Sequence, residues 1–373
     1  MSEDARKAEA LLAAIHDTCR NPWTLMEVCG GQTHALLRHG IDRLLPEQLQ
    51  LIHGPGCPVC VTASEHLDHA IALAQQPNVI LCSYGDMLRV PGSTGQTLLE
   101  ARARGANVRV VYSPLDVLAS ASANPNQRVV FLAVGFETTA PATALLALQA
   151  QAAGVTNLEL LVCHVRVPPV LDQMLSEPAC QVQAVLAAGH VCTVMGDEAY
   201  TELVERHRRP IVITGFSAEE LLRGILAAVQ QLEAGVHRLE NAYRPAVKDG
   251  GNATGQALLE RVFEPVDTIW RGLGVIAAGG YRLKVPFDQF AVRGTGATAD
   301  PTELPAEASP TQPAQPPPAA PASADCPAGA VLQGLIKPHQ CPHFGGRCTP
   351  DQPMGAPMVS SEGACAAYHR YQG

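Results

Sequence analysis

Short apolar stretches recur along the chain, and most are bounded by Gly, Pro or Asn. Their length and their content of Val, Ile and Leu predict β-strands. One group of these strands lies before residue 128 and a second group follows it. The first group is 24–28, 50–53, 79–83 and 108–112, and the second is 129–134, 158–163, 184–186 and 211–214.

The longer segments between these strands repeat apolar residues at helical spacing. An alternation of strands and helices is typical of α/β proteins with parallel sheets. We therefore expect two doubly wound α/β lobes facing a cleft, the first at 1–127 and the second at 128–255. The expected helices include 63–76, 97–103, 140–153 and 218–234.

The amino-acid composition of the sequence changes past residue 297. Residues 300–324 are dominated by Pro, Ala, Ser, Thr and Gln, which predicts an extended, mobile linker. Residues 325–373 are rich in Cys, Gly and Pro and show little periodicity. A module this small needs a stabilising crosslink or bound metal, and its four cysteines could supply one. The third expected domain is thus 256–373, with the Pro-rich linker inside it.

Composition narrows the possible functions. The net charge is −9 and no run of Lys or Arg could follow a phosphate backbone, which argues against nucleic-acid binding. The first residues predict an amphipathic helix, and no stretch reaches the roughly 20 apolar residues of a membrane span. We expect a soluble, cytoplasmic protein. Because cytoplasmic thiols stay reduced, its 12 cysteines predict metal binding or redox chemistry.

Side chains capable of chemistry follow the expected strands. Open α/β sheets bind ligands outside the carboxyl ends of their strands, so these side chains are expected to line one cleft. The candidates are Cys29, the pair Cys57 and Cys60, the pair Asp86 and Arg89, Glu137, and His190.

Cys57 and Cys60 form a C-x-x-C motif at a strand-to-helix turn. This spacing lets two sulfurs meet as a disulfide, and a helix N-terminus lowers the pKa of a thiol. Half of a zinc site is the competing interpretation, but the chain has no second C-x-x-C motif to complete it. The motif favours a redox pair.

Cys29 precedes two glycines, which places its thiol on a tight turn with backbone amides pointing inward. A thiolate in that position would be a good iron ligand or nucleophile. The spacing is equally compatible with a buried, inert cysteine. Glu137, His190 and the Asp86/Arg89 pair are types suited to proton transfer or to orienting a small anion. Taken singly, each is better explained as a satisfied polar residue at a strand end.

The C-terminal module carries Cys326, Cys341, Cys348 and Cys365, separated by 14, 6 and 16 residues. Four thiolates suit either a zinc ion or a [4Fe–4S] cluster. Zinc sites typically bring their ligands in close pairs, so the wide spacing favours a cluster. A separate glycine pattern at 272–277 matches G-x-G-x-x-A, but its context predicts a turn rather than a nucleotide site.

At these residues the sequence resembles the HypD family of hydrogenase maturation proteins, from about residue 23 to the C-terminus. Several motifs in order carry the resemblance, and together they are highly specific. They are Met-Glu-Val-Cys-Gly-Gly at 26–31, His-Gly-Pro-Gly-Cys-Pro-Val-Cys at 53–60, Gly-Phe-Glu-Thr-Thr at 135–139, Trp-Arg-Gly-Leu-Gly at 270–274, Lys-Pro-His-Gln-Cys-Pro at 337–342, and Ser-Glu-Gly-Ala-Cys at 361–365.

The resemblance implies two α/β lobes facing a cleft and a C-terminal part that holds a [4Fe–4S] cluster. It implies that Cys57 and Cys60 are a redox pair and that Cys29 is a ligand to an iron under assembly, the Fe(CN)2CO centre of [NiFe] hydrogenases. A HypC-type chaperone would share that iron, HypE would deliver cyanide, and electrons would pass from cluster to dithiol to the nascent centre. The implied cluster ligands are Cys326, Cys341, Cys348 and Cys365.

Two departures from the family pattern matter. Family members often have His where this chain has Gln32, which leaves His34 as the available proton-transfer residue on that turn. The linker also looks long, which predicts a loosely docked module. We expect a maturation factor with redox chemistry rather than a free-standing metabolic enzyme. The alternatives are an iron–sulfur-dependent protein disulfide reductase and a non-catalytic interaction protein with a structural zinc site.

Overall fold

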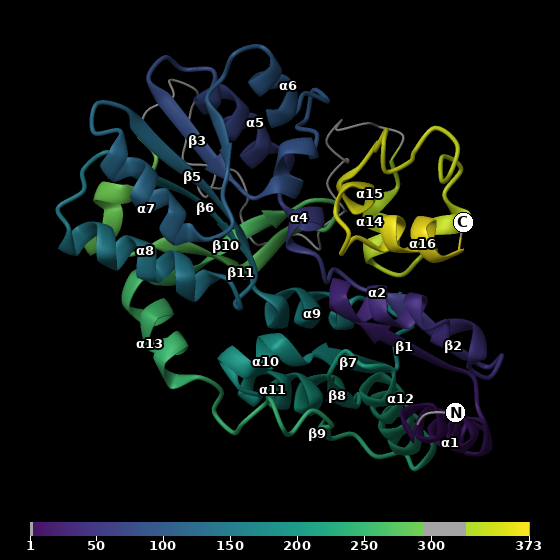
Figure 1. Ribbon diagram of the computed structural model, residues 1–373. Helices are drawn as coiled ribbons and strands as arrows, with labels where there is room; N and C mark the ends of the chain where they lie inside the picture. The colour runs from purple at the N-terminus through teal and green to yellow at the C-terminus, as the bar shows by residue number, and fades with distance from the viewer. Residues whose placement is uncertain (1–2, 294–325, 373) are drawn as a thin grey trace.

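A computed structural model describes residues 3–293 and 326–372, so the expected linker at 300–324 lies outside the described residues. The fold is α/β, as expected, with two parallel sheets that form the centres of two lobes (Figure 1). In the described parts of the chain, no helix is both long enough and apolar enough to cross a membrane.

The lower lobe in Figure 1 is built on a five-stranded parallel sheet with the order β2-β1-β7-β8-β9. Leu25 and Leu51 face one apolar layer and Met26 and Ile52 face the other, so both sides of the sheet are buried. Helices α1 and α12 cover the first side, and α9, α10 and α11 cover the second. The strands are β1 (Trp23–Glu27), β2 (Leu49–His53), β7 (Ala184–Ala188), β8 (Ile211–Thr214) and β9 (Leu239–Asn241). The helices are α1 (Glu3–Thr18), α2 (Gly30–Arg38), α3 (Ile41–Leu44), α9 (Val167–Ser176), α10 (Gly189–Met195), α11 (Glu198–His207) and α12 (Ala218–Glu233).

The upper lobe has a four-stranded parallel sheet with the order β4-β3-β5-β6. Its two faces also alternate, since Val129 and Phe131 enter one core and Val130 and Leu132 the other. Helices α7 and α8 pack on the first face, and α5 and α6 on the second. The strands are β3 (Val79–Ser83), β4 (Val108–Val110), β5 (Arg128–Gly135) and β6 (Leu158–His164). The helical segments are α4 (Pro58–Val61), α5 (Ser64–Ala74), η1 (Gly85–Arg89), α6 (Leu98–Ala103), α7 (Pro114–Ala123) and α8 (Ala140–Ala152).

The expected grouping of the strands into a first four and a second four is wrong. The chain leaves the lower lobe after β2, builds the whole upper sheet from β3 to β6, and then returns to add β7, β8 and β9. No single cut at residue 127 therefore separates the two sheets. The positions of the strands follow from local pattern, but their partners depend on burial on both faces, which no single segment specifies.

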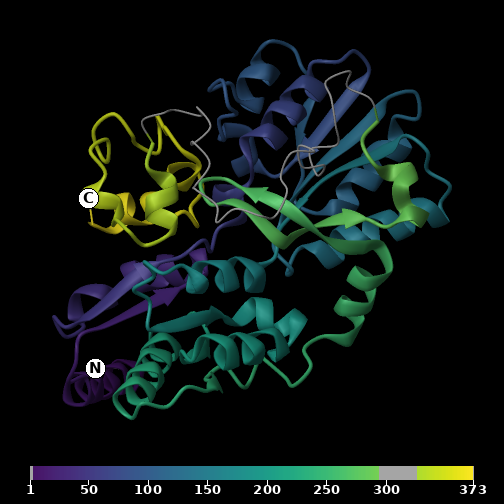
Figure 2. The ribbon, with the colours of Figure 1, turned by 180° about the vertical axis from the view of Figure 1, so that it is seen from behind.

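An antiparallel hairpin with two long strands was not expected from the sequence. Its strands β10 (Phe263–Trp270) and β11 (Gly274–Leu283) cross behind the upper lobe, as seen best in Figure 2. Phe263 and Tyr281 belong to the same core as β5 and β6, so residues that were grouped with the C-terminal module belong to the upper lobe. Helices α13 (Ala253–Val262) and η2 (Val285–Phe290) flank the hairpin. The glycine pattern at 272–277 begins at its tight turn, where Gly272 and Gly274 have positive φ, as the expected turn requires.

The C-terminal module is seated against both lobes, contrary to the expectation of loose docking. Arg89 of the upper lobe donates a hydrogen bond to the carbonyl of Val359 at 2.7 Å. His53 of the lower lobe is hydrogen-bonded through Nε2 to the hydroxyl of Tyr368 at 3.0 Å. The module consists of α14 (Ala328–Leu332), η3 (Pro338–Gln340), α15 (Ala356–Val359) and α16 (Ala364–Gln372).

Candidate functional site

The turn that carries Cys29 is fixed by a buried carboxylate at the end of β1. The backbone N–H of Cys29 donates to Oε2 of Glu27 at 2.9 Å, while Oε1 of Glu27 accepts from the hydroxyl of Thr33 and lies 2.6 Å from Nδ1 of His53. Glu27 is fully buried, so these bonds compensate for the loss of water. We missed this residue in the sequence, although a carboxylate inside an apolar strand was the available signal.

Cys29 is paired with a histidine from another part of the chain. Cys29 precedes the first residue of α2, and His190 lies at the start of α10, with 3.5 Å between Sγ and Nδ1. Burial raises the pKa of the Cys29 thiol, and the charge of Glu27 raises it further. Two backbone N–H groups lower the pKa but do not cancel the rise. Burial also lowers the pKa of His190. The structure therefore brings together a protonated thiol and a neutral imidazole.

Cys57 and Cys60 are joined as a disulfide at the start of α4, with 5.2 Å between their Cα atoms. Cys57 precedes Pro58, the first residue of the helix, and the backbone N–H of Cys60 lies 3.2 Å from the Cys57 sulfur. Both side chains are buried, at 3% and 0% exposure. The C-terminal module closes over the pair, since Cys60 Sγ lies 3.9 Å from the carbonyl oxygen of Ala356.

The two cysteine-bearing turns touch one another. The N–H of Gly30, which follows Cys29, donates to the carbonyl of Gly56, which precedes Cys57, at 2.8 Å. A Cβ on Gly56 would lie 2.3 Å from the backbone nitrogen of Cys29, so only glycine permits this approach. The shared placement of these turns after neighbouring strands β1 and β2 produces the contact.

Glu137 lies in the loop after β5 and is also buried. Its Oε1 accepts a hydrogen bond from the N–H of Val167 at 2.9 Å, whereas Oε2 has no partner among the described residues. Burial raises the pKa of Glu137 to about 7, outweighing the opposing effects of the backbone hydrogen bonds and Arg166. The buried Tyr200 is influenced electrostatically by both Glu137 and Cys29, which places the two groups in one neighbourhood.

His34 contacts the C-terminal module. Its Nε2 lies 2.8 Å from the hydroxyl of Tyr371 on α16, and the two rings meet edge to face. Burial lowers the pKa of His34, and the positive charges of Arg370 and Arg38 lower it further. A role for His34 in proton transfer stays a prediction, while its contact shows that α2 and α16 are held together at this point.

Two further residues are engaged in contacts within the fold. The side-chain amide of Gln32 is fully buried and donates to Thr214 Oγ1 at 2.6 Å and to the carbonyl of Ala187 at 3.1 Å, so it bridges the ends of β7 and β8. Arg89 lies 3.8 Å from Asp86 but directs its hydrogen bonds to carbonyls of the C-terminal module. Within the expected Asp86/Arg89 pair, Arg89 thus makes a docking contact.

The four C-terminal cysteines lie in one neighbourhood. Cys326, Cys341 and Cys348 all raise the pKa of Cys365 electrostatically, after the larger effect of burial. The N–H of Met354 donates to the sulfur of Cys348 at 3.4 Å. Within residues 3–293 and 326–372, no three His, Cys, Asp or Glu side chains converge closely enough to hold a metal ion. The thiols are neighbours in space without forming a closed ligand set.

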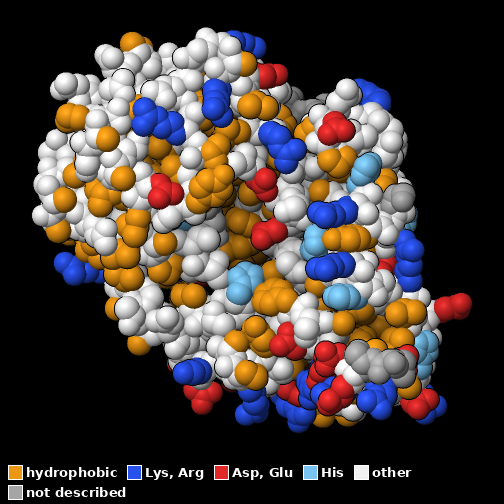
Figure 3. All heavy atoms as spheres, in the orientation of Figure 1, with side chains coloured by type: hydrophobic (Ala, Val, Ile, Leu, Met, Phe, Trp, Pro, Cys, Tyr) orange, Lys and Arg blue, Asp and Glu red, His pale blue; other side chains and the backbone are white. Residues whose placement is uncertain are grey.

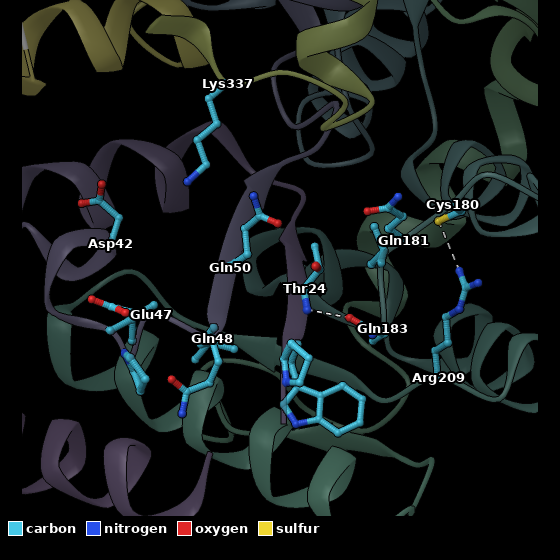
Figure 4. Close-up of a pocket in the computed structure, with 16 residues that line it drawn as sticks. Thr24, Asp42, Glu47, Gln48, Gln50, Cys180, Gln181, Gln183, Arg209 and Lys337 are labelled. Atoms are coloured by element: carbon cyan, nitrogen blue, oxygen red, sulfur yellow. Dashed lines mark hydrogen bonds between the residues drawn. The ribbon is translucent and has the colours of Figure 1, made fainter. Parts of the chain in front are cut away.

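The face shown in Figure 3 is hollowed where the two lobes and the C-terminal module meet, and hydrophobic side chains line much of the hollow. A different cavity, of about 920 Å³, lies at the opposite ends of the strands. Thr24 and Gln50 at the starts of β1 and β2 form its floor, and Lys337 and Arg209 approach it from the two sides shown in Figure 4. It is distinct from the surroundings of Cys29.

The fold and the site define a two-lobed α/β protein whose chemically capable groups are mainly cysteine thiols. The HypD family model, described as "Hydrogenase formation hypA family", matches residues 6–372. The "Hydrogenase maturation factor HypD" of Escherichia coli (strain K12) is 44% identical over 356 residues, which cover 95% of this chain and 91% of that protein. The protein of the same name from Azotobacter vinelandii is 43% identical over 373 residues, 98% of this chain and 94% of the relative. The chain belongs to the HypD family.

Proposed function

We propose that this protein is a hydrogenase maturation factor that serves as scaffold and redox protein for assembly of the Fe(CN)2CO centre of [NiFe] hydrogenases. Relatives that match nearly the whole chain are named hydrogenase maturation factors. The observation that carries the proposal is the contact between the Cys29 turn and the Cys57–Cys60 turn through Gly30 and Gly56. It puts a single thiol beside a redox-capable pair.

Cys29 is the proposed ligand of the iron under assembly, which is the cargo of the protein. A thiolate is a soft ligand suited to iron, but the buried thiol must first lose its proton. His190 is within hydrogen-bonding distance: its Nδ1 lies 3.5 Å from the sulfur, and burial favours its neutral form. As the iron–sulfur bond forms, the thiol proton passes to Nδ1 of His190, and the Glu27 network holds the turn in place.

Cys57 and Cys60 are the proposed redox pair. Reduction breaks their sulfur–sulfur bond, takes two electrons and two protons, and leaves two thiols; oxidation reverses this balance. Their burial argues against the competing hypothesis of a protein disulfide reductase, because a protein disulfide substrate must reach an attacking sulfur. A redox partner that is part of the same protein does not need to reach the buried sulfurs from solution.

Cys326, Cys341, Cys348 and Cys365 are the proposed ligands of a [4Fe–4S] cluster. The donor set suits one: four mutually interacting thiols, with a backbone N–H directed at one sulfur. Gly355 packs closely against Cys326, since a Cβ there would lie 2.5 Å from its sulfur, and only glycine permits this approach. A cluster spreads its thiolate ligands further apart than a single ion does, which is compatible with the lack of a tight ligand group in the described residues. When bound, such a cluster exchanges electrons.

The proposed partners are a HypC-type chaperone that shares the iron and HypE as the donor of cyanide. The test is infrared spectroscopy of this protein purified anaerobically with its HypC-type partner, from cells with and without HypE. We expect nitrile and metal-carbonyl stretches in the first sample and no nitrile stretches in the second. Absence of both bands from the first sample would contradict the scaffold function. Zinc without iron or sulfide in the purified protein would contradict the cluster.

A further inference from the structure

The turn between β10 and β11 lies between the disulfide and the cysteine module. The N–H of Arg271 donates to the carbonyl of Val61, the last residue of the disulfide helix α4, at 2.8 Å. On its other side the turn packs against α14, where a Cβ on Gly329 would lie 2.5 Å from the carbonyl oxygen of Gly272. Helix α14 begins directly after the Cys326–Pro327 dipeptide. One turn therefore contacts both cysteine-bearing segments.

The guanidinium of Arg271 is partly buried and incompletely paired. One nitrogen donates to the carbonyl of Pro91 at 2.8 Å, but the buried Nε has no hydrogen-bond partner among the described residues. Glu65 and Asp68 act on it electrostatically, yet within residues 3–293 and 326–372 neither forms an ion pair with it. A partly buried charge without an ion pair is costly, so a further negative group beside Arg271 would stabilise it.

Cys326 is where that negative group would be bound. Arg271 and Cys326 influence one another electrostatically: the cation favours the thiolate, and the thiolate favours the cation. Cys326 in turn interacts with Cys341 and Cys348. A site built from four thiolates carries a net negative charge even after it binds iron and sulfide.

We propose that Arg271 is a positioning residue for the four-cysteine site, where its guanidinium supplies the counter-charge that raises the reduction potential of the bound cluster. The inference rests on the proposed function, because it requires that Cys326 and its neighbours hold a [4Fe–4S] cluster. Reduction adds one negative charge to a cluster. A nearby fixed cation stabilises that charge, so its removal lowers the potential.

The test is a dye-mediated potentiometric titration of the full-length protein, purified anaerobically, followed by visible absorbance and electron paramagnetic resonance. Iron and sulfide content of the wild type is measured first. Arg271→Gln and Arg271→Met remove the charge, and Arg271→Lys keeps it. Arg282→Gln is the matched control, because Arg282 lies on the same hairpin and pairs with Glu264 in solvent.

We expect the two neutral variants to bind iron and to have a more negative midpoint potential than the wild type. The potential of Arg271→Lys should lie between that of the neutral variants and that of the wild type, and Arg282→Gln should have the wild-type potential. A neutral variant with full iron content and the wild-type potential would overturn the inference. Equal iron loss in the Lys, Gln and Met variants would also overturn it, since only the shape of arginine would then matter. A wild type with no cluster would refute the cluster assignment itself, and that result appears before any variant is made.

Discussion

The sulfur of Cys29 lies 3.5 Å from Nδ1 of His190, although 161 positions separate the two residues. Cys29 follows β1 and His190 follows β7, and these strands are neighbours in the lower sheet. Their pairing exists because the chain builds the whole upper sheet, β3 to β6, before returning to add β7 beside β1. The proposed iron ligand and its proton acceptor thus both belong to the lower lobe. The contact with the Cys57 turn connects them to the segment that leads into the upper lobe.

The Cys29→Ser variant tests the iron ligand. Serine keeps the shape of the side chain, but its hydroxyl is a poor, normally protonated ligand. We expect the variant to retain the visible absorbance of the [4Fe–4S] cluster and to lose the cyanide and carbonyl infrared bands in the complex with the HypC-type partner. Cys192→Ser, at another buried cysteine of the same lobe, is the control. Bands that persist unchanged in Cys29→Ser would assign the iron to another residue.

Changing Cys57 or Cys60 to Ser removes the disulfide without touching the C-terminal cysteines. We expect iron and sulfide content to remain at the wild-type level and hydrogenase maturation to stop, as measured by hydrogenase activity in complemented cells. Cys180→Ser is the control, since that thiol is only half-buried and lies outside both sites. Iron loss in the Cys57 or Cys60 variant would mean that the pair binds metal.

The Cys341→Ala variant removes one proposed cluster ligand. Metal binding and folding are coupled in a module this small, so we expect depleted iron and faster proteolysis of the C-terminal module. The two lobes should keep their far-ultraviolet circular dichroism, because each has its own buried core. His343→Ala in the same loop should retain iron. Global unfolding of Cys341→Ala would show that the lobes depend on the module.

Glu137 should make the protein less stable as pH rises. Burial raises its pKa from 4.5 to about 7, so the folded state binds more protons than the unfolded state between these values. The stability contributed by the protonated form is present below about pH 4.5 and is lost as pH rises through 7, by about 3 kcal/mol in total. Denaturant unfolding at pH 5 and pH 8 should show this decrease in the free energy of unfolding for the wild type, and a smaller decrease for Glu137→Gln. An identical decrease in both proteins would refute the raised pKa.

Gln32 should matter for stability and not for the iron centre. Gln32→Ala removes the amide that bridges β7 and β8 and leaves a cavity, at a cost of about 2 kcal/mol in the free energy of unfolding. We expect a lower denaturation midpoint with unchanged cyanide and carbonyl bands. Gln50→Ala, at an exposed glutamine on β2, should change neither. Loss of the bands in a folded Gln32→Ala protein would indicate a role in the chemistry.

The sequence by itself determined the α/β class, most strand positions and the cysteines worth testing. Val79–Ser83 and Ile211–Thr214 were predicted to the residue because strongly β-forming side chains stand between clear breaks. The placement of Cys29 and Cys57 after β1 and β2 also followed from the sequence, because the carboxyl ends of neighbouring parallel strands share one edge. Local pattern was sufficient for these features.

Only the tertiary structure decided which strands share a sheet, and with it the partners of the candidate residues. Both sheets are buried on both faces, so their strands look alike in sequence and nothing local assigns β7 to β1 rather than to β6. The pairing of Cys29 with His190 depends on that assignment, and the contact of the 270–274 turn with α14 depends on the docking of the C-terminal module. Contacts between segments so distant in the chain arise from packing, which the pattern of one segment does not contain.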